Sequence, residues 1–390
     1  MADTNSNLNS NSKVDAQKQK ISWSPPDFGE DEKEAAIAVI NSGWITQGKE
    51  TEAFERELES YTGAKHAVVV NNGTSALIAS LLAHNIGPGD EVIVPSLTFI
   101  ATVNSVIAVG AKPVLADSDI NTWNLTPELA EKKITKKTRA VIPVDAGGMP
   151  VDIGGFTALA KKHSLILIED AAEALGSRYK GESIGSFGHT SIVSFHIAKS
   201  VATAEGGAIL TNDGEIAAKL RRIRNHGMSA PYNASKNIHY DYVDFGLNFR
   251  ITDIQSAIGR SQLKKLDTLI QKRKKIVDYY KSELKEYVTF QSIPDYVTLH
   301  PYLFFGITAK DEQERNALAK HLLENGVDIR ICWLPAHKQP YHSKLFPNEN
   351  LPNSEALSKT QITLPLGNGL SMEQAEYVAK TVKSFFEKNK

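Results

Sequence analysis

Three segments of this 390-residue chain carry side chains that suit anion binding and amine chemistry. The first is Asn71-Asn72-Gly73-Thr74-Ser75, which stands between an apolar run and a helix-like stretch. The unpaired N–H groups at a helix N-terminus attract anions, and glycine lets an anion approach the backbone closely. The segment therefore predicts a phosphate site, although Thr and Ser also serve as ordinary helix caps.

An acid and an amine follow two other apolar runs. Asp170 comes directly after the run 164–169, and a carboxylate buried there needs a cation or several hydrogen-bond donors. Lys199 comes after the run 191–195 and before a Glu-Gly-Gly turn at 205–207. A lysine held in a pocket can lose its proton and attack a carbonyl as a neutral amine. Each of the two residues alone is more often structural, as a capping acid or a solvated lysine.

The elements around these segments form a repeating pattern. From about residue 50 to 213, short apolar runs alternate with amphipathic stretches, which predicts an α/β fold with a mostly parallel mixed sheet covered by helices on both faces. The predicted strands are 66–70, 91–95, 112–116, 139–144, 164–169, 191–195 and 207–211. Ligands of such sheets bind outside the carboxyl ends of the strands, which is where all three segments stand. A phosphate cradle, an acid and a lysine at one such edge are what a pyridoxal 5'-phosphate (PLP) enzyme needs.

The chain divides into three parts by composition and pattern. Residues 1–22 are rich in polar residues and predict a disordered N-terminal tail. Residues 23–270 form the predicted large PLP-binding α/β domain, and a long helix from about 250 to 290 leads into a small C-terminal α+β domain, residues 271–390. The long, aromatic segment 227–246 is predicted to reach over the active site of a neighbouring subunit, since loops of that length are usually functional.

The composition excludes several classes of protein. Lysine and arginine number 44 and aspartate and glutamate 45, so the net charge of −1 provides no basic field for nucleic acid. No apolar run approaches the roughly 20 residues that span a bilayer, and the start lacks the apolar region of a secretory signal, so we expect a cytoplasmic protein without a membrane partner. Cys332 is the single cysteine, which excludes a disulfide within the chain and indicates a core thiol. No metal site is predicted, and the missing G-x-G-x-x-G motif argues against a nicotinamide-dependent dehydrogenase.

Several longer segments carry a resemblance to a known family. They are SGWITQGKETEAFE (42–55), NNGTSAL (71–77), PSLTFIATVNSVIAVGAKPV (95–114), IEDAAEALGSRYKG (168–181), SFHIAKSVATAEGG (194–207), NFRITDIQSAIG (248–259) and LPLGNGLSMEQ (364–374). On these segments, from about residue 28 to 385, the sequence resembles the DegT/StrS family of PLP-dependent aminotransferases, which act on nucleotide-linked keto sugars. The spacing S-F-x-x-x-K followed by E-G-G is the most specific feature. The resemblance implies the fold type I architecture of PLP enzymes.

The resemblance also implies a role for each matching residue. Lys199 corresponds to the lysine that forms the Schiff base with PLP, Asp170 to the acid that binds the pyridine nitrogen, and Phe99 to the aromatic that stacks on the ring. Glu173, where many members have Gln or His, lies near the ring hydroxyl. The implied phosphate contacts are Gly73, Thr74, Ser194 and, across a homodimer with shared active sites, Asn248. The implied substrate contacts are Trp44, Arg250 for the carboxylate of the donor, and His337.

The reaction that the resemblance implies is a ping-pong transamination. An amino acid, with L-glutamate as the expected donor, would pass its amino group to PLP through the Lys199 aldimine and leave 2-oxoglutarate and pyridoxamine phosphate (PMP). The reverse steps would aminate a keto sugar, expected to be nucleotide-linked, for amino-sugar and cell-surface polysaccharide biosynthesis. Two departures from the family pattern are Ala204, in place of the usual glycine, and residues 144–148 (VDAGG), in place of a turn near the sugar pocket that often contains histidine.

Two other functions are compatible with parts of the same pattern. A PMP-dependent sugar dehydratase of this family would carry histidine where Lys199 stands, so the lysine favours transamination. A non-catalytic PLP-binding regulatory protein could share the fold, since fold alone does not decide function. The complete set of Lys199, Asp170 and the phosphate cradle favours an enzyme.

Overall fold

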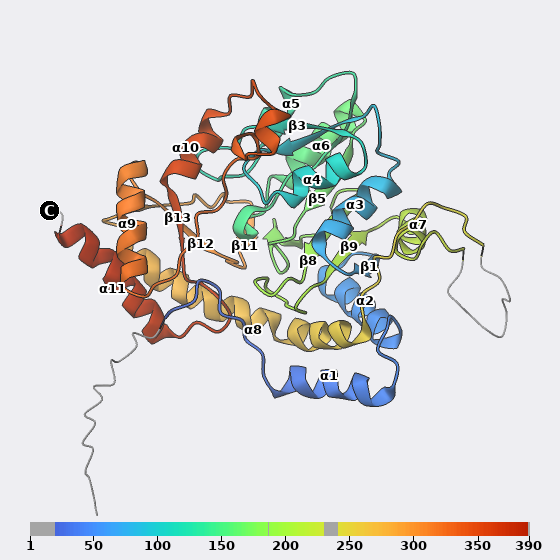
Figure 1. The fold of residues 1–390 in the computed structure, drawn as a ribbon, viewed down its shortest axis with the longest axis horizontal. Helices are drawn as coiled ribbons and strands as arrows, with labels where there is room; N and C mark the ends of the chain where they lie inside the picture. Colours follow the sequence, from blue (N-terminus) through green and yellow to red (C-terminus); the bar gives the residue numbers. More distant parts are fainter. Residues whose placement is uncertain (1–19, 186, 230–240, 389–390) are drawn as a thin grey trace, which may run out of the picture.

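The computed structural model describes residues 20–185, 187–229 and 241–388, and one large sheet is its central feature (Figure 1). The strands of this sheet are β1 (His66–Val70), β2 (Glu91–Pro95), β3 (Lys112–Ala116), β4 (Thr138–Val141), β5 (Ile166–Asp170), β8 (Thr190–Ser194) and β9 (Gly207–Thr211). They lie in the order β1-β9-β8-β5-β4-β2-β3. Strand β9 is antiparallel to both its neighbours, and the other adjacent pairs are parallel. The predicted mostly parallel mixed sheet is confirmed.

Helices cover both faces of this sheet. On one face pack α2 (Lys49–Thr62), α6 (Ile153–His163) and the first half of α8 (Asp253–Leu284), and on the other α3 (Gly73–Ala83), α4 (Ala101–Ala108) and α7 (Gly214–Arg224). Side chains alternate along a strand, so Leu167 of β5 joins the first layer and Ile168 joins the second. By the same alternation Glu169 points toward the first layer and Asp170 toward the second.

Strand β4 ends earlier than the sequence predicts, at Val141 instead of 144. Proline has no N–H to donate to a strand ladder, and Pro143 interrupts the pairing. The pairing resumes as an isolated parallel bridge between Val144 and Asp170. The segment after β4 therefore still runs beside the carboxyl end of β5.

The C-terminal part is built on a second sheet. Its strands, in spatial order, are β10 (Thr289–Phe290), β12 (Phe305–Thr308) and β13 (Gln361–Leu364), and its helices are α9 (Glu312–Glu324), α10 (Pro352–Thr360) and α11 (Met372–Lys388). A further small sheet joins β11 (Val297–Leu299), β6 (Arg178–Tyr179) and β7 (Glu182–Ser183). The remaining elements are α1 (Glu30–Ser42), α5 (Pro127–Glu131) and the 3-10 turns Ala146–Gly148, Ala336–Lys338 and His342–Lys344.

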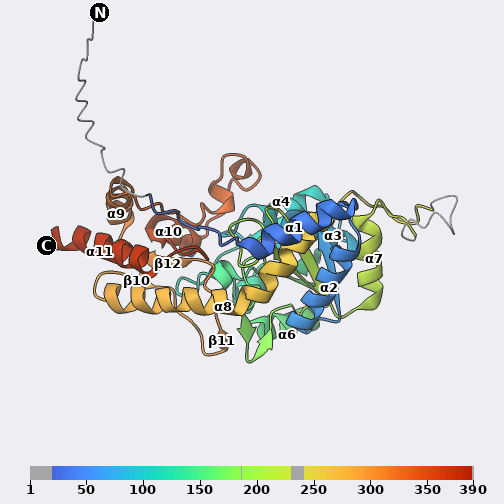
Figure 2. The same ribbon diagram turned by 90° about the horizontal axis from the view of Figure 1, so that it is seen from below.

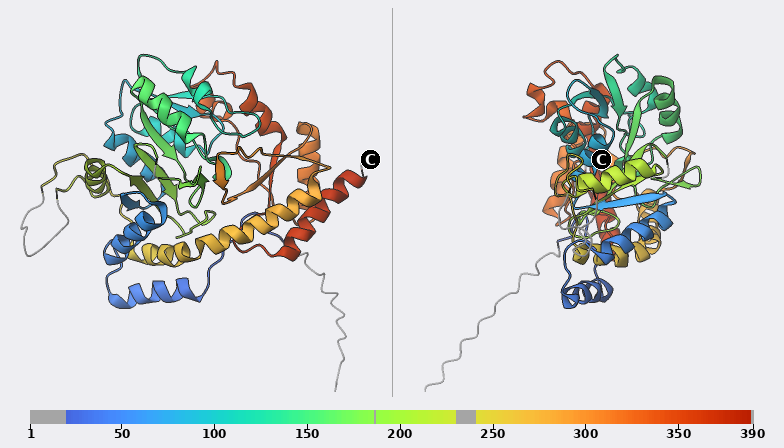
Figure 3. Two further views of the ribbon diagram at one scale, coloured as in Figure 1. Left: turned by 180° about the vertical axis from the view of Figure 1, so that it is seen from behind. Right: turned by 90° about the vertical axis from the view of Figure 1, so that its right-hand side faces the viewer.

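Helix α8 belongs to both parts of the molecule. Figure 2 shows helix α8 running along both the large domain and the C-terminal part. In Figure 3, helix α1 packs on the side of α8 that faces away from the large sheet. A capping box of Thr252 and Gln255 fixes its start, and no proline interrupts it. Leu266 packs in the core of the large sheet and Tyr280 in the C-terminal core, so the predicted domain boundary at 270/271 falls inside one continuous helix. Neither α8 nor another helix of the described ranges is long and apolar enough to cross a membrane.

The first described residues are part of the fold. Ile21 is 4% exposed in the C-terminal core, and its N–H donates to the carbonyl of Gly326 (2.9 Å). The indole N–H of Trp23 donates to the hydroxyl of Thr363 (2.8 Å). The predicted disordered tail, residues 1–22, is therefore too long at its C-terminal end, because the short apolar group Ile-Ser-Trp finds a place on the C-terminal part. Residues 1–19 lie outside the described residues.

The substitution Ile21→Ala tests whether this segment contributes to the core. We expect it to lower the free energy of unfolding by about 2–4 kcal/mol, because it empties a buried site. Urea unfolding followed by tryptophan fluorescence measures the change. As a control, Ile120→Ala removes the same atoms from a side chain that is 41% exposed and should change the free energy by less than about 0.5 kcal/mol. Equal effects of the two substitutions would contradict the assignment.

Candidate active site

The loop between β8 and β9 carries Lys199. The N–H of Lys199 donates to the carbonyl of His196 (2.8 Å), and the N–H of Thr203 donates to the carbonyl of Phe195 (2.8 Å). Ala204 has a φ of 67°, in the left-handed region that costs an L-residue roughly 1–2 kcal/mol. This backbone shape is the physical reason why glycine suits position 204. The loop holds Lys199 at the carboxyl end of β8.

Lys199 forms an ion pair with Glu173. Its Nζ lies 3.0 Å from Oε1 of Glu173, and the two side chains are 17% and 10% exposed. The other carboxylate oxygen accepts the N–H of Gly147 (2.8 Å), in the turn that follows β4. The contact therefore joins the segments that follow three strands, β8, β5 and β4.

Asp170 lies beside this ion pair and is almost fully buried. It accepts the hydroxyl of Thr102 (2.8 Å) and the N–H of Ala172 (3.2 Å). Burial raises the pKa of Asp170 to about 6, while these two hydrogen bonds and the charge of Lys199 act in the opposite direction. Thr98 lies 3.1 Å from Thr102 and precedes Phe99, whose ring is 60% exposed.

The N-terminus of α3 forms a cradle beside β8 and β9. The side chain of Asn72 caps the helix by accepting the N–H of Ser75 (2.8 Å). A Cβ on Gly73 would lie 3.1 Å from Cβ of Ser194, and Thr74 is exposed. The helix end, a glycine and two hydroxyls thus lie together, and these are groups that suit an anion.

Two further observations concern the floor of this cradle. A Cβ on Gly207 would lie 2.7 Å from the carbonyl atoms of Asn72, which explains the glycine in the Glu-Gly-Gly turn. The side-chain oxygen of Asn71 is buried without a hydrogen-bond partner among the described residues. A polar group therefore remains there for a bound molecule to satisfy.

Asn248 and Arg250 lie beside the cradle. The carbonyl of Phe249 accepts the N–H of Asn71 (2.9 Å), which fixes the segment next to the start of α3. Nη1 of Arg250 donates to the side chain of Asn225 (2.7 Å), and Asn248 is exposed. The guanidinium is thus held in place, and the asparagine is accessible from outside the chain.

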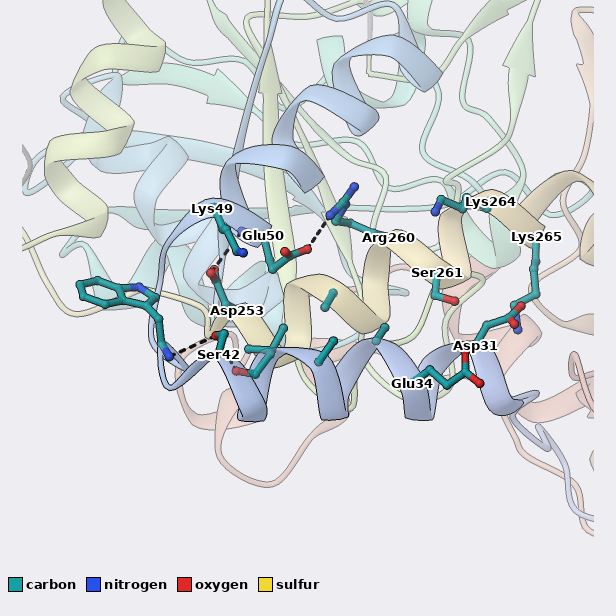
Figure 4. Close-up of a pocket in the computed structure, with 15 residues that line it drawn as sticks. Asp31, Glu34, Ser42, Lys49, Glu50, Asp253, Arg260, Ser261, Lys264 and Lys265 are labelled. Carbon is teal, nitrogen blue, oxygen red and sulfur yellow. Dashed lines mark hydrogen bonds and ion pairs between the residues drawn. The ribbon is translucent and has the colours of Figure 1, made fainter.

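The structure does not bring Trp44 to this cluster. Its indole, 59% exposed, donates to the carbonyl of Gln47 (3.2 Å) and lines a pocket of about 530 Å³ between α1 and α8. Figure 4 shows this pocket, with the ion pair of Glu50 and Arg260 at one side. Neither Lys199 nor Asp170 lines it. The predicted substrate contact of Trp44 stays a prediction.

His337 is a buried link between two segments. Its Nδ1 lies 2.7 Å from the hydroxyl of Ser96, and its Nε2 lies 3.0 Å from Oε1 of Glu355. The residue is 3% exposed, so neither ring nitrogen is available to a substrate. This arrangement argues against the predicted substrate contact, because both ring nitrogens of His337 already have partners within the chain. The sequence alone does not reveal these partners, since they come from distant segments.

Thr102 and Arg273 are site residues that the sequence analysis missed. Thr102 stands within the motif 95–114, yet only the packing of α4 on β5 brings it to Asp170. Arg273 of α8 is buried, and its Nη2 donates to the hydroxyl of Ser200 (3.0 Å), the residue after Lys199. Burial lowers the pKa of Arg273 to about 10.

Cys332 is a buried thiol that packs with Phe304 and Leu357. Burial raises its pKa to about 12, so the thiol stays protonated and unreactive, as the sequence analysis predicts for a core cysteine. Within the described ranges of the chain, no group of three or more His, Cys, Asp or Glu residues could hold a metal ion.

Comparison with known proteins agrees with this geometry. The sequence pattern of the DegT/DnrJ/EryC1/StrS aminotransferase family matches residues 26–383. The spore coat polysaccharide biosynthesis protein SpsC of Bacillus subtilis (strain 168) is 34% identical over 381 residues, which cover 93% of this chain and 96% of SpsC.

Solved structures extend the likeness to the fold and the cofactor. Helicobacter pylori PseC, an aminotransferase involved in the biosynthesis of pseudoaminic acid, has a TM-score of 0.89 at 32% identity and covers 95% of this chain and 100% of its own. Spr1654 from Streptococcus pneumoniae, in its PMP form, has a TM-score of 0.89 at 30% identity and covers 94% and 99%. Its PLP form is similar as well. The chain belongs to the DegT/DnrJ/EryC1/StrS aminotransferase family and is a PLP-dependent sugar aminotransferase.

Proposed function

We propose that this protein transfers an amino group from an amino acid, with L-glutamate as the expected donor, to a keto sugar that becomes part of a cell-surface polysaccharide. The observation that carries the proposal is the cluster of Lys199, Glu173 and Asp170 at adjacent strand ends. The names of SpsC, for spore coat polysaccharide biosynthesis, and of PseC, for pseudoaminic acid biosynthesis, support the substrate class. A nucleotide on the sugar and a cytoplasmic location stay predictions.

The residues at the strand ends fit PLP in charge and shape. When bound, PLP supplies an aldehyde that condenses with amines and a ring that accepts an electron pair. The cradle of Gly73, Thr74 and Ser194 would hold its phosphate, and the exposed ring of Phe99 would stack on the pyridine. Asp170 would accept a hydrogen bond from the protonated ring nitrogen, since each charge favours the other.

Lys199 is the proposed carrier of the proton that leaves Cα of the donor. The lysine would bind the cofactor in the resting enzyme and act as general base and acid once the donor has displaced it. Glu173 lies within hydrogen-bond distance of the amine and would orient it. Arg250, held by Asn225, would bind the carboxylate of the donor. Donor and sugar would use the same cluster in turn, as a ping-pong mechanism requires.

We also propose a homodimer in which Asn248 completes the neighbouring active site. Near it, Tyr242, Val243 and Phe245 are 62%, 57% and 69% exposed in the single chain, an apolar row that indicates a contact surface. These residues belong to an arm that projects beyond α7 (Figure 1). Residues 230–240 lie outside the described residues, so the reach of the segment 227–246 over a neighbouring subunit stays a prediction.

The substitution Lys199→Ala tests the central role. We expect it to abolish amino transfer and the absorbance band of the lysine-bound cofactor, because no other amine replaces the Schiff-base nitrogen. Mass spectrometry of keto sugars incubated with glutamate measures turnover, and absorbance spectroscopy measures the band. The control Lys161→Ala removes an exposed lysine and should leave both unchanged. Turnover and band surviving in Lys199→Ala would refute the assignment.

The substitution Thr102→Val tests the pairing of Asp170 with the ring nitrogen. Without the hydroxyl the pKa of Asp170 rises further, so the carboxylate is less available to the cofactor. We expect the dissociation constant of PLP to rise about 10–150-fold, the equivalent of one hydrogen bond to a charged group. Fluorescence titration of the cofactor-free protein measures it. Thr102→Ser keeps the hydroxyl and should bind as the wild type does; equal weakening of both variants would contradict the role.

Mixing two inactive subunits tests the shared site. Lys199→Ala and Asn248→Ala homodimers should each be nearly inactive, whereas a one-to-one mixture re-equilibrated through monomers should recover about a quarter of the wild-type activity, since half of its dimers contain one intact site. If Asn248 served the site of its own subunit, the mixed dimers would contain no intact site. Failure of the mixture to exceed its parents would therefore exclude the shared arrangement.

A further inference from the structure

Two buried carboxyl groups behind Asp170 each have an oxygen without a hydrogen-bond partner among the described residues. Asp145 is 0% exposed; its Oδ1 accepts the N–H of Val151 (2.9 Å), and its Oδ2 has no partner there. Glu169 is also 0% exposed; its Oε2 accepts the hydroxyl of Ser191 (2.6 Å), and its Oε1 has no partner there. Buried polar atoms in native proteins are almost always satisfied, so these two oxygens need an explanation.

The backbone brings the two groups together. The N–H of Asp170 donates to the carbonyl of Pro143 (2.9 Å), and the N–H of Asp145 donates to the carbonyl of Asp170 (3.1 Å). Val144 pairs with Asp170 and shares its face of the sheet, so Asp145 and Glu169 share the opposite face. In this register Glu169 faces Pro143 and Asp145 faces Ala171, so the two carboxyl side chains lie diagonally across one face of the sheet, with their Cα atoms roughly 8 Å apart, which is within reach of two such side chains.

The surroundings of Asp145 and Glu169, here called the acid pair, do not favour two charges. The titratable groups that act on the pair within the described residues are Asp170, Glu173 and the phenol of Tyr296, and the N–H of Gly185 (3.3 Å) is a further neutral donor to Glu169. Burial raises the pKa of Asp145 well above its usual value and the pKa of Glu169 to about 7. Near neutral pH the pair therefore retains a proton.

We propose that Asp145 and Glu169 share one proton in a hydrogen bond between Oδ2 of Asp145 and Oε1 of Glu169, and that this sharing keeps Asp170 the ionised acid of the cluster. The proton satisfies both unpartnered oxygens and limits the pair to one negative charge. A second charge would raise the pKa of Asp170, because coupled acids oppose each other's ionisation. The acid pair is thus a positioning device behind the cofactor's partner, and only this last step rests on the proposed function.

The pH dependence of urea unfolding of the cofactor-free protein tests the shared proton. The pKa of the pair is higher in the folded than in the unfolded chain, so its stabilisation is present at low pH and is lost as the pH rises to about 7. For the wild type and the exposed control Asp295→Asn, we expect the unfolding equilibrium constant to rise up to about tenfold per pH unit between roughly pH 5 and 7 from this source. Asp145→Asn should lack this rise, since the amide can donate to Glu169 without titrating. Repeating the comparison in an Asp170→Asn background removes the titration of Asp170, so the difference that remains isolates the pair.

Equal pH dependence in the wild type and Asp145→Asn would overturn the proposal. Glu169→Gln is the second variant, because its amide can donate to Asp145, and it should lose the same rise; if Asp145→Asn does not fold, this variant decides. No turnover is measured, so the outcome is independent of whether the chain performs transamination, which the Lys199→Ala experiment decides separately.

Discussion

The burial of acids at the carboxyl end of β5 is the constraint on which the rest of the site depends. Three carboxyl groups lie within five residues at this strand end, those of Glu169, Asp170 and Glu173. A fourth, that of Asp145, comes from the segment that runs beside it. Each must be compensated locally, because a buried charge without a partner is unstable. Lys199 compensates Glu173, and the hydroxyl of Thr102 compensates Asp170. The position of Lys199 is therefore tied to the electrostatic balance of the acids at this strand end.

The parallel sheet is what makes this balance possible. The ends of β1, β2, β5 and β8 stand at one edge because right-handed crossovers return each strand in the same direction. Residues as far apart in sequence as Gly73 and Ser194 thereby become neighbours without long loops. Antiparallel β9 then passes beneath the start of α3, and the absence of a side chain at Gly207 lets the two backbones approach. Three rigid elements thus present Gly73, Asp170 and Lys199 at the same edge of the sheet.

The sequence alone predicted the features that depend on neighbours along the chain. The strands are the short apolar runs themselves, and the helices show as the amphipathic stretches between them. The predicted phosphate cradle, Asp170 and Lys199 each come directly after one of these runs. Hydrophobic patterning is a local signal, so all of these features can be predicted from neighbouring residues. The place of Ile21, the contact of Thr102 with Asp170 and the two hydrogen bonds of His337 depend on packing between distant segments. No periodicity encodes such contacts. The early end of β4 could have been predicted from the sequence, since Pro143 has no N–H to donate to a neighbouring strand.

The C-terminal part acts on the lysine loop through Arg273. Its guanidinium is buried and donates to the carbonyl of Pro301 (2.8 Å), the side chain of Asn368 and the hydroxyl of Ser200 (3.0 Å). These three partners are neutral, so no opposite charge stabilises the guanidinium of Arg273. Its planar group instead holds three hydrogen bonds in fixed directions. Pro301 and Asn368 belong to the C-terminal part and Ser200 follows Lys199, so Arg273 links that part directly to the loop that carries Lys199. The long helix α8, which carries Arg273 and packs in both cores, thereby fixes the two cores relative to the lysine loop.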